Sequence, residues 1–438
     1  MNAKHEKREV SHSVAVSDVR KDGTLIELIY DRTAEATRFA VFDGETVKFE
    51  KRFDDGHETL VPVSASNNLI RHEAVLLPDG LEAFGTTEGL VDDIQAYLYK
   101  YVDLSEPFAR LATWYVLLTW VYDAFNELPY LRLRGDYGSG KSRALTVIGG
   151  VAYKAFFASG ASTVSPIFHT LDTFRGTLIF DEADFRFTDE KSELVKILNN
   201  GNVRGFPVLR TAITLKKEFD PRAFLVFGPK IVAMRGSYDD QALESRFLTE
   251  EMGQRPMRRD IPINLPDSQK EEARHLRNRL LDYRFRNFHR ISINASFVDQ
   301  TLSPRMNQIL VPLLSIVEEE ADRARVREAV ASFDGRLTAD RTGTAEAGVL
   351  EVLVELSERT ATGPIHVSVI ADSFIKRYRT EYERPITNKF VGGVLRKRLR
   401  ILTVKSHGVY VVPESERPKI REIAIRYGVL SRNEEGTG

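Results

Sequence analysis

Cysteine is absent from this 438-residue sequence. Its absence excludes disulfide bonds, thiolate zinc sites and cysteine nucleophiles, and it suits a reducing compartment. The sequence also lacks an apolar run of the roughly 20 residues that a membrane span needs. Its most apolar stretch, LATWYVLLTWVYDAF, ends at Phe125 and contains Asp123. We therefore interpret this stretch as a buried helix with Trp114 and Trp120 in its core, and we expect no membrane partner.

An excess of charge of one sign is missing as well. The 62 Lys and Arg residues nearly balance the 63 Asp and Glu residues, for a net charge of −1. Only local patches can therefore indicate a charged partner. The first residues, MNAKHEKREVSHS, have no apolar signal-peptide core. With 42 % hydrophobic and 29 % charged residues, the chain has the composition of a soluble globular protein, and its 438 residues suit roughly two to four domains. We expect it in the cytoplasm.

Strands and helices alternate in the middle of the chain. Residues 141–155, 163–174 and 190–198 have helical patterns. The β-prone stretches are, in chain order, YLRL, FFASGA, GTLIFDEAD, KIVAMR and RFLTEEM. Such alternation predicts an α/β fold with a parallel sheet between two layers of helices.

The stretch GDYGSGKS joins the first of these strands to the first helix. Gly135, Gly140, Lys141 and Ser142 fit the phosphate-binding loop pattern G-x-x-x-x-G-K-[ST], the Walker A motif, and Gly138 adds a further glycine. Glycines let backbone N–H groups cradle phosphate oxygens, and the helix N-terminus favours the same charge. Lys141 is expected to reach the β- and γ-phosphates of ATP, and Ser142 to bind Mg²⁺. A strand-to-helix turn that matches by chance is the alternative.

A pair of acids follows the apolar strand GTLIFDEAD. Asp181 and Glu182 are predicted to lie at its carboxyl end, where parallel sheets bind ligands. We expect Asp181 to hold Mg²⁺ and Glu182 to orient the attacking water. Solvated acids at the start of a loop are the alternative. With Lys141 upstream, the pair indicates an ATP hydrolase.

Downstream of these acids, FGPKIVAMRGSYDDQALESRFLTEEM resembles the sensor-1 strand and the arginine-finger helix of AAA+ ATPases, and ALESRF is similar to a motif of minichromosome maintenance helicases. By this resemblance Arg246 is an arginine finger that enters the ATP site of the neighbouring subunit. That role implies a homo-oligomeric ring, usually a hexamer. A surface salt bridge at a helix end is the alternative.

The sensor-1 position departs from the family pattern. The family usually has Asn or another small polar residue at the end of this strand, whereas this sequence has Met234 and Arg235. Either Arg235 contacts the γ-phosphate itself or the motif has drifted. In SPRMNQILVPLLSIV, Arg305 opens an amphipathic helix and resembles the sensor-2 arginine. A helix-opening arginine without a nucleotide role is the alternative.

The segment from Gly201 to Lys230 resembles the pre-sensor-1 hairpin of superfamily 3 and minichromosome-maintenance-like helicases. In that family the hairpin grips single-stranded DNA in the ring channel. Lys216 and Lys217 are the expected tip residues, with Arg210 and Arg222 as lesser candidates. A solvated charge pair on an ordinary hairpin is the alternative.

The last part of the chain has the pattern of a winged helix. Two helical stretches precede ILTVKSHGVYVV, which predicts a hairpin turning at His407–Gly408. Seven basic residues and no acid fall between positions 384 and 405. This excess of positive charge indicates contact with DNA phosphates, and duplex DNA is the candidate ligand. The residues proposed for this contact are Lys389, Arg396, Arg398 and Lys405. Protein contact through a solvated basic face is the alternative.

These patterns predict the domain order. We expect a β-rich N-terminal domain at 1–86, a helical linker or collar at 87–128, an AAA+ P-loop core with a helical lid at 129–335, a linker at 336–363 and a winged helix at 364–430.

The resemblance implies a ring-forming, ATP-dependent DNA translocase or helicase of a replication or mobile-element system. It would use ATP and Mg²⁺ and act with a primase or another replication protein. One rival is a DNA-binding AAA+ switch or assembly platform, such as a transposition regulator or defence ATPase, without unwinding. A protein-remodelling AAA+ ATPase is the second rival.

Overall fold

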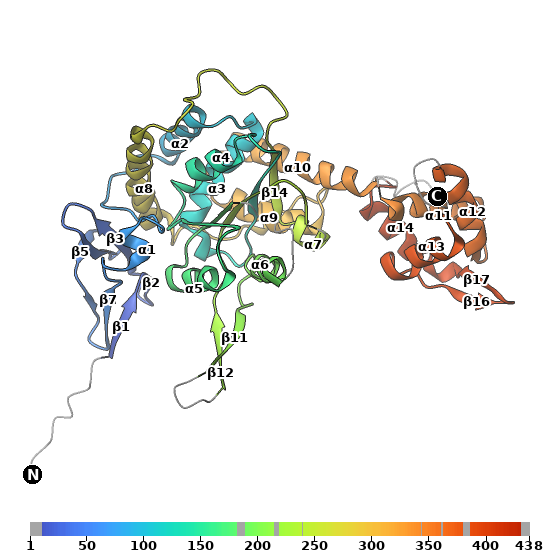
Figure 1. Cartoon of the computed structure of the whole chain (residues 1–438), viewed down its shortest axis with the longest axis horizontal. Helices are drawn as coiled ribbons and strands as arrows, with labels where there is room; N and C mark the ends of the chain where they lie inside the picture. The colour runs from blue at the N-terminus through green and yellow to red at the C-terminus, as the bar shows by residue number, and fades with distance from the viewer. Residues whose placement is uncertain are drawn as a thin grey trace, which may run out of the picture. The chain divides into compact units, whose positions relative to one another are not determined.

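The computed structural model describes residues 11–181, 189–213, 219–238, 240–342, 344–360, 362–379 and 386–430. The chain forms two compact units (Figure 1). The first consists of Met1–Val298 and Pro304–Val330, and the second of Asp299–Ser303 and Ala331–Gly438.

Most of the secondary structure belongs to the first unit. Its strands are β1 (Ser11–Ala15), β2 (Ser17–Val19), β3 (Leu25–Asp31), β4 (Ala36–Phe42), β5 (Val47–Glu50), β6 (Phe53–Asp54), β7 (Glu58–Pro62), β8 (Tyr130–Arg134), β9 (Phe156–Ser159), β10 (Leu178–Asp181), β11 (Val208–Ile213), β12 (Phe219–Phe224), β13 (Lys230–Met234) and β14 (Phe247–Glu251). Its helices are α1 (Asn68–Arg71), α2 (Thr87–Tyr101), α3 (Glu106–Trp120), α4 (Lys141–Gly149), α5 (Val164–Phe174), α6 (Asp189–Asn200), α7 (Gln241–Glu244), α8 (Asp267–Asn287) and α9 (Pro304–Ser315), and α10 (Glu320–Thr342) continues into the second unit.

The centre of the first unit is a five-stranded parallel sheet in the order β14-β8-β13-β10-β9. Residues of β8, β10, β13 and β14 are buried almost throughout, as expected for strands covered on both faces. Helix α4 packs on β8, β10 and β13. The predicted α/β fold with a parallel sheet flanked by helices is thus confirmed.

Helix α4 is shorter than the sequence pattern predicts. We expected a helix over 141–155, but α4 ends at Gly149. A Cβ at Gly149 would lie 2.9 Å from Cγ1 of Ile179 on β10, so this turn lies too close to the sheet for a side chain. The chain then turns through Lys154, which has a positive φ of 43°, and enters β9.

The part of the 1–86 segment that the structure describes is mainly β. Strands β2-β3-β4-β5 form an antiparallel sheet, and β1-β7-β6 form a second sheet in which β1 and β7 are parallel. The chain then runs beside the central sheet, where Val75 forms a bridge with Phe156 and the Leu76 N–H donates to the Ala155 carbonyl at 2.8 Å. This pairing covers backbone groups of the edge strand β9.

A buried charge network joins the N-terminal strands to the central sheet. The carboxylate of Glu27, on β3, accepts from Lys154 Nζ and from Arg284 Nε, both at 2.7 Å. Arg284, on α8, also makes a bidentate pair with Asp123 at 2.7 Å on each side. The two cations and two carboxylates balance, and the charges of Glu27, Lys154 and Arg284 are each paired away from water. Burial lowers the pKa of Lys154 to about 8, despite its pairing with Glu27.

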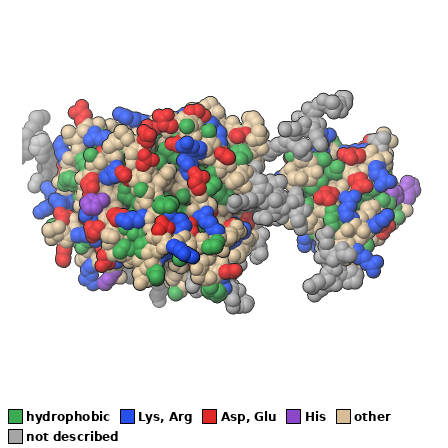
Figure 2. All heavy atoms as spheres, turned by 90° about the horizontal axis from the view of Figure 1, so that it is seen from above, with side chains coloured by type: hydrophobic (Ala, Val, Ile, Leu, Met, Phe, Trp, Pro, Cys, Tyr) green, Lys and Arg blue, Asp and Glu red, His purple; other side chains and the backbone are tan. Residues whose placement is uncertain are grey.

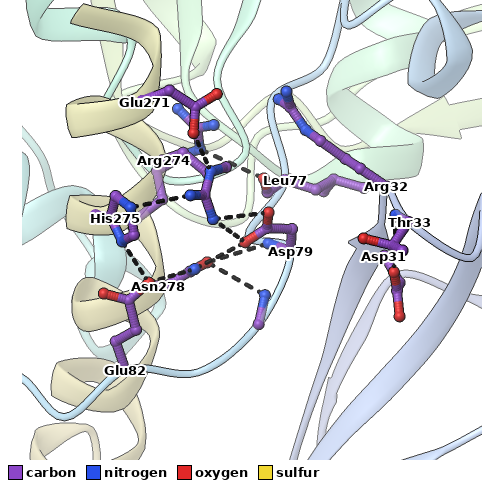
Figure 3. A network of polar contacts seen from close by, with 12 residues as sticks. Asp31, Arg32, Thr33, Leu77, Asp79, Glu82, Glu271, Arg274, His275 and Asn278 are labelled. Atoms are coloured by element: carbon purple, nitrogen blue, oxygen red, sulfur yellow. Dashed lines mark hydrogen bonds and ion pairs between the residues drawn. The ribbon is translucent and has the colours of Figure 1, made fainter. Parts of the chain in front are cut away.

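A second polar network ties α8 to the segment before α2 (Figure 3). Asn278 accepts from the N–H groups of Asp79 and Gly80 and donates to Asp79 and Glu82. Arg274 reaches both carboxylate oxygens of Asp79, at 3.0 and 3.1 Å. Helix α8 therefore holds the connecting segment along its length.

The first part of the long apolar stretch, Leu111 to Trp120, lies in the buried helix α3 as predicted, and the rest forms a 3-10 turn at Tyr122–Ala124. Trp114 and Trp120 are buried, and Trp120 Nε1 donates to the Val151 carbonyl at 3.0 Å. Within the described residues, every helix is too short or too polar to cross a bilayer. On the face of the first unit seen in Figure 2, acidic and basic side chains are interspersed.

The second unit contains helices and a small antiparallel sheet in the order β15-β17-β16. Its elements are α11 (Ala345–Arg359), β15 (Ile365–His366), α12 (Val367–Tyr378), α13 (Asn388–Gly393), the π-helical turn η4 (Val394–Arg398), β16 (Val404–Ser406), β17 (Val409–Val412) and α14 (Arg417–Arg426).

The structure describes much of the expected linker at 336–363 as helix, because it contains the end of α10 and all of α11. Buried residues of α11, such as Leu350 and Leu353, belong to the core of the second unit. The hairpin turn at His407–Gly408 is as predicted, since both residues have positive φ, as a tight two-residue turn requires.

Candidate functional site

The glycine-rich loop lies at the carboxyl edge of the central sheet, between β8 and α4. Gly138 and Gly140 have φ of 72° and 90°, which disfavour other residues. Gly135 is needed for a different reason, because a Cβ there would lie 2.6 Å from the Met252 carbonyl oxygen. The loop is thus folded tightly against the residue that follows β14.

Lys141 holds the loop together from within. Its Nζ donates to the carbonyl oxygens of Gly135 and Asp136 at 2.6 and 2.7 Å. The residue that caps α4 is Gly140, which offers no side-chain hydrogen bond to the first turn. An ammonium group and a helix N-terminus without a side-chain cap meet at one loop, and this combination fits a phosphate group.

The predicted magnesium ligands lie at the same edge. Ser142 is exposed in the first turn of α4, and Asp181 is the last residue of β10. Strand β13 separates β10 from β8, so these strand ends lie about 10 Å apart. Among the described residues there is no group of three or more His, Asp or Glu side chains suited to a metal ion. Mg²⁺ would therefore need phosphate and water as further ligands. Glu182 lies outside the described residues.

Arg235 follows β13 and lies beside the loop. Its guanidinium stacks over the ring of Tyr137, 4.4 Å from the ring centroid, and NH1 donates to the Tyr137 hydroxyl at 2.6 Å. Tyr137 occupies one of the variable loop positions and is 78 % exposed. A cation is thus placed at the loop by the residue that follows a neighbouring strand, and this position suits the first of the two alternatives for Arg235, contact with a phosphate.

A pocket of about 710 Å³ lies beyond the loop, between α2, α3 and the chain after β14. The Met252 N–H donates to the Arg134 carbonyl at 2.6 Å, and the chain then leads to Arg255 and Arg258 in the pocket wall. The Arg258 guanidinium lies over the Tyr99 ring at 3.6 Å. The pocket combines apolar, cationic and acidic side chains, and sequence patterns did not indicate it.

Arg246 lies at the opposite edge of the sheet from the loop. Its carbonyl accepts from the N–H of Tyr130, the first residue of β8, whereas the loop follows the last. The five residues of β8 separate the two edges by about 13 Å. Arg246 therefore cannot reach the glycine-rich loop of its own chain.

The surroundings of Arg246 include a second cation. NH1 donates to Asn199 on α6, and Nε is buried without a hydrogen-bond partner among the residues that the structure describes. Burial, and then repulsion by Arg305 at the start of α9, lower the pKa of the Arg246 guanidinium. The structure thus brings the predicted finger and the predicted sensor-2 residue together, and it places both away from the loop of the same chain.

A buried ion pair positions α7, the short helix before Arg246. Arg132, on β8, makes a bidentate pair with Glu244 at 2.5 and 2.7 Å. Glu244 also accepts from the Tyr238 N–H at 2.6 Å, and Arg132 donates from Nε to the Thr249 hydroxyl at 3.0 Å. Strand β8 therefore fixes the helix that carries the first residues of the ALESRF motif.

The predicted hairpin is present as β11 and β12, which pair in antiparallel register from Val208–Phe224 to Ile213–Phe219. It projects beyond α5 and α6 (Figure 1). Lys216 and Lys217 lie outside the described residues.

The candidate DNA contacts of the second unit differ in their surroundings. Lys389, Arg396, Arg398 and Lys405 are all exposed. Arg396 lies over the ring of Tyr410 at 5.3 Å, next to the hairpin. Arg398 instead pairs with Glu346 on α11 at 3.2 Å, so its charge is partly neutralised.

Comparisons with known proteins add little to this geometry. No family model and no curated protein matches the sequence. Among the solved structures that match is the A form apo structure of the NrS-1 C-terminal region, with 11 % identity and a TM-score of 0.38, over 89 % of this chain and 96 % of that chain. A likeness this weak supports no argument, and the site is judged on its own residues.

Proposed function

We propose that this protein is an AAA+ ATPase that assembles as a ring and moves along DNA, as in a replication or mobile-element system. The observation that carries the proposal is the placement of the cations at the two edges of one sheet. Lys141 and Arg235 lie at the loop edge, and Arg246 and Arg305 lie at the other. One chain therefore offers a phosphate-binding loop and, separately, a pair of arginines that its own loop cannot use.

In the proposed ring, the arginine edge of one subunit faces the loop edge of the next. The backbone of the glycine-rich loop and Lys141 bind the ATP phosphates, and Arg246 of the adjacent copy neutralises charge that develops on the γ-phosphate. The buried Nε of Arg246 would gain an acceptor at this interface. Arg305 would add a second cation from the same side.

Ser142 and Asp181 are the residues that would hold Mg²⁺, which neutralises phosphate charge when bound. Glu182 is proposed to orient the attacking water, on the sequence argument alone. The pocket beside Arg255 and Arg258 is our proposed place for the base of ATP, because the chain after Met252 leads from the loop to it.

The proposed coupling to DNA runs through the hairpin. Strand β12 ends at Phe224, and β13, which carries Arg235 at its end, begins six residues later at Lys230. A movement of Arg235 when ATP is hydrolysed could thus shift β13 and, through it, the hairpin. Lys216 and Lys217 are proposed to contact the strand, and the basic residues of the second unit, proposed to be a winged helix, would bind duplex DNA.

The first test measures ATP hydrolysis at low salt without DNA, with single-stranded DNA and with duplex DNA. Low salt is needed because phosphate contacts weaken as salt rises. The proposal predicts stimulation by DNA, and loss of hydrolysis in Lys141→Ala and in Arg246→Ala. A rate that depends on both residues but ignores DNA would contradict the DNA-motor part and favour a protein substrate.

Unwinding is tested separately with a strand-displacement assay. Replacing both Lys216 and Lys217 by Ala is expected to block displacement while basal ATP hydrolysis survives. Normal displacement by this double variant would show that the hairpin lysines do not grip the strand. Nucleotide-dependent binding without displacement by the wild-type protein would instead indicate a switch or assembly platform.

A further inference from the structure

A second pocket, of about 460 Å³, lies at the root of the hairpin. It is bounded by α5, α6 and both hairpin strands. Its principal side chains are Phe168, His169, Glu193, Arg210, Arg222 and Phe224. The sequence suggested Arg210 and Arg222 as hairpin contacts but did not indicate a pocket, and the proposed nucleotide site does not include it.

Three aromatic rings meet in this pocket. Phe168 and Phe224 pack edge to face at 4.7 Å, and both are buried. His169 stacks on Phe168 at 5.0 Å and meets Phe224 at 4.5 Å, but it is itself exposed. The pocket therefore presents a rigid aromatic wall with one ring open to solvent.

Two arginines of the hairpin lie over this wall. Arg210 stacks over Phe168 at 5.2 Å, and Arg222 over Phe224 at 5.1 Å. Glu193 of α6 pairs with Arg210, so one guanidinium is held by a carboxylate. Arg222 is exposed, and its contact within the described part of the chain is with an aromatic ring.

The first turn of α5 completes the pocket. Val164 and Ser165 line it, and Thr163, which precedes α5, makes no side-chain cap to the described residues of that turn. The positive end of this 11-residue helix thus lies beside the two arginines. Planar rings, planar cations and a helix N-terminus together favour a ligand that is both flat and anionic.

A nucleotide of a single strand has both properties. Bases stack on aromatic side chains and guanidinium planes, and the phosphate is attracted by the cations. The volume lies within the range of small-ligand pockets. Glu193 offers an acceptor for an exocyclic amino group. An apolar segment of a protein would leave the exposed Arg222 guanidinium without a polar partner.

We infer that this pocket receives an unstacked base, with its phosphate, from a single DNA strand that runs along the hairpin. The inference rests on the proposed function and deepens it, because the hairpin then holds the strand by a base as well as by its backbone. The pocket gives the strand a fixed register on each subunit.

The test separates base recognition from backbone attraction. Binding of an oligodeoxycytidylate, whose bases carry an exocyclic amino group, and of an abasic strand of equal length is measured by fluorescence anisotropy at low salt. The wild-type protein is expected to prefer the strand with bases. His169→Ala should weaken binding of that strand on the order of tenfold and leave binding of the abasic strand unchanged. Arg222→Lys, which keeps the charge but loses the planar stack, should act in the same direction.

Both substituted side chains are exposed, so the variants are expected to fold. His57→Ala, at an exposed histidine before β7, is the matched control and should bind as the wild type does. Equal losses on both strands, or an unchanged preference in His169→Ala, would overturn the pocket while the translocase proposal stands. Failure of the wild-type protein to bind either strand would overturn both.

Discussion

The guanidinium of Arg235 lies over the ring of Tyr137, 4.4 Å from the ring centroid, so the residue that follows β13 touches the glycine-rich loop through a cation–π contact. We predict that Arg235→Ala lowers kcat for ATP hydrolysis about a hundredfold or more, because in the proposed site it removes the charge that would meet the γ-phosphate. Tyr137→Phe keeps the ring and loses only the hydroxyl bond, and its kcat should stay close to that of the wild type. Steady-state hydrolysis measures both. A wild-type rate in Arg235→Ala would exclude a sensor role for this residue.

Mixing two inactive variants tests the trans arrangement. Lys141→Ala and Arg246→Ala should each be inactive alone. Each interface of the proposed ring joins the loop of one subunit to the finger of the next. In an equal random mixture, about one quarter of the interfaces therefore combine the intact loop of an Arg246→Ala subunit with the intact finger of a Lys141→Ala subunit. We therefore expect hydrolysis to return on mixing. No recovery, with mixed rings shown by co-purification of differently tagged chains, would contradict a finger that acts between subunits.

The pair between Arg132 and Glu244 predicts a loss of stability. Glu244→Gln leaves the Arg132 guanidinium buried without its counter-charge, and we expect the free energy of unfolding to fall by about 3 kcal/mol. Urea unfolding followed by tryptophan fluorescence reports on the first unit, because both tryptophans of the chain lie in α3. Glu271→Gln, in an exposed pair with Arg274, is the control and should change stability by less than about 1 kcal/mol. Equal effects in the two variants would contradict the importance of the buried pair.

Because Lys230 is buried, we expect the free energy of unfolding to depend on pH. Burial lowers the pKa of its ammonium to about 7, and Nζ donates to the carbonyls of Gly201, Val226 and Gly228. Between pH 7 and the usual lysine pKa, the unfolded chain binds a proton that the folded chain has lost. Stability therefore rises with pH in this window, by up to about 1.4 kcal/mol per unit.

The matched variant for this effect is Lys230→Met. Relative to it, the wild type should gain about 2 kcal/mol between pH 7 and pH 9, measured by urea unfolding at each pH. Lys48→Met removes an exposed lysine and should leave the wild-type pH dependence unchanged. Parallel curves for the wild type and Lys230→Met would show that Lys230 stays charged when the chain folds.

The second unit predicts unequal effects of two neighbouring arginines. Arg396→Ala should weaken binding of duplex DNA and lower the slope of log K against log salt by about 1. Arg398→Ala should have a smaller effect, because Arg398 already pairs with Glu346. Binding isotherms at several salt concentrations measure both slopes. Equal slopes for the two variants would mean that the Glu346 pair does not weaken the contact.

The sequence predicted what depends on neighbouring positions. The loop from Gly135 to Ser142 is recognisable because its glycines, lysine and hydroxyl act within one turn of chain. The parallel sheet followed from alternating strand and helix patterns, and the His407–Gly408 turn from its local backbone preference.

Contacts between side chains that lie far apart in the sequence could not be predicted from sequence patterns. Arg235 and Tyr137 are 98 positions apart, and Glu27 and Arg284 are 257 apart. A charged residue in a sequence carries no mark of its burial, so sequence patterns do not indicate that Glu27, Lys154 and Lys230 are buried. The early end of α4 was missed because it depends on the close approach of Gly149 to Ile179.

The buried network around Glu27 has a consequence for any attempt to divide the chain. A shortened protein that starts at residue 87 would keep Lys154 and Arg284 but only Asp123 to oppose them, leaving one positive charge uncompensated in its interior. It would also expose backbone groups of β9 that residues 74–76 now cover. The β-rich segment thus supplies a buried counter-charge and covers the edge strand of the central sheet. A fragment without this segment is expected to aggregate unless the segment is added as a separate chain.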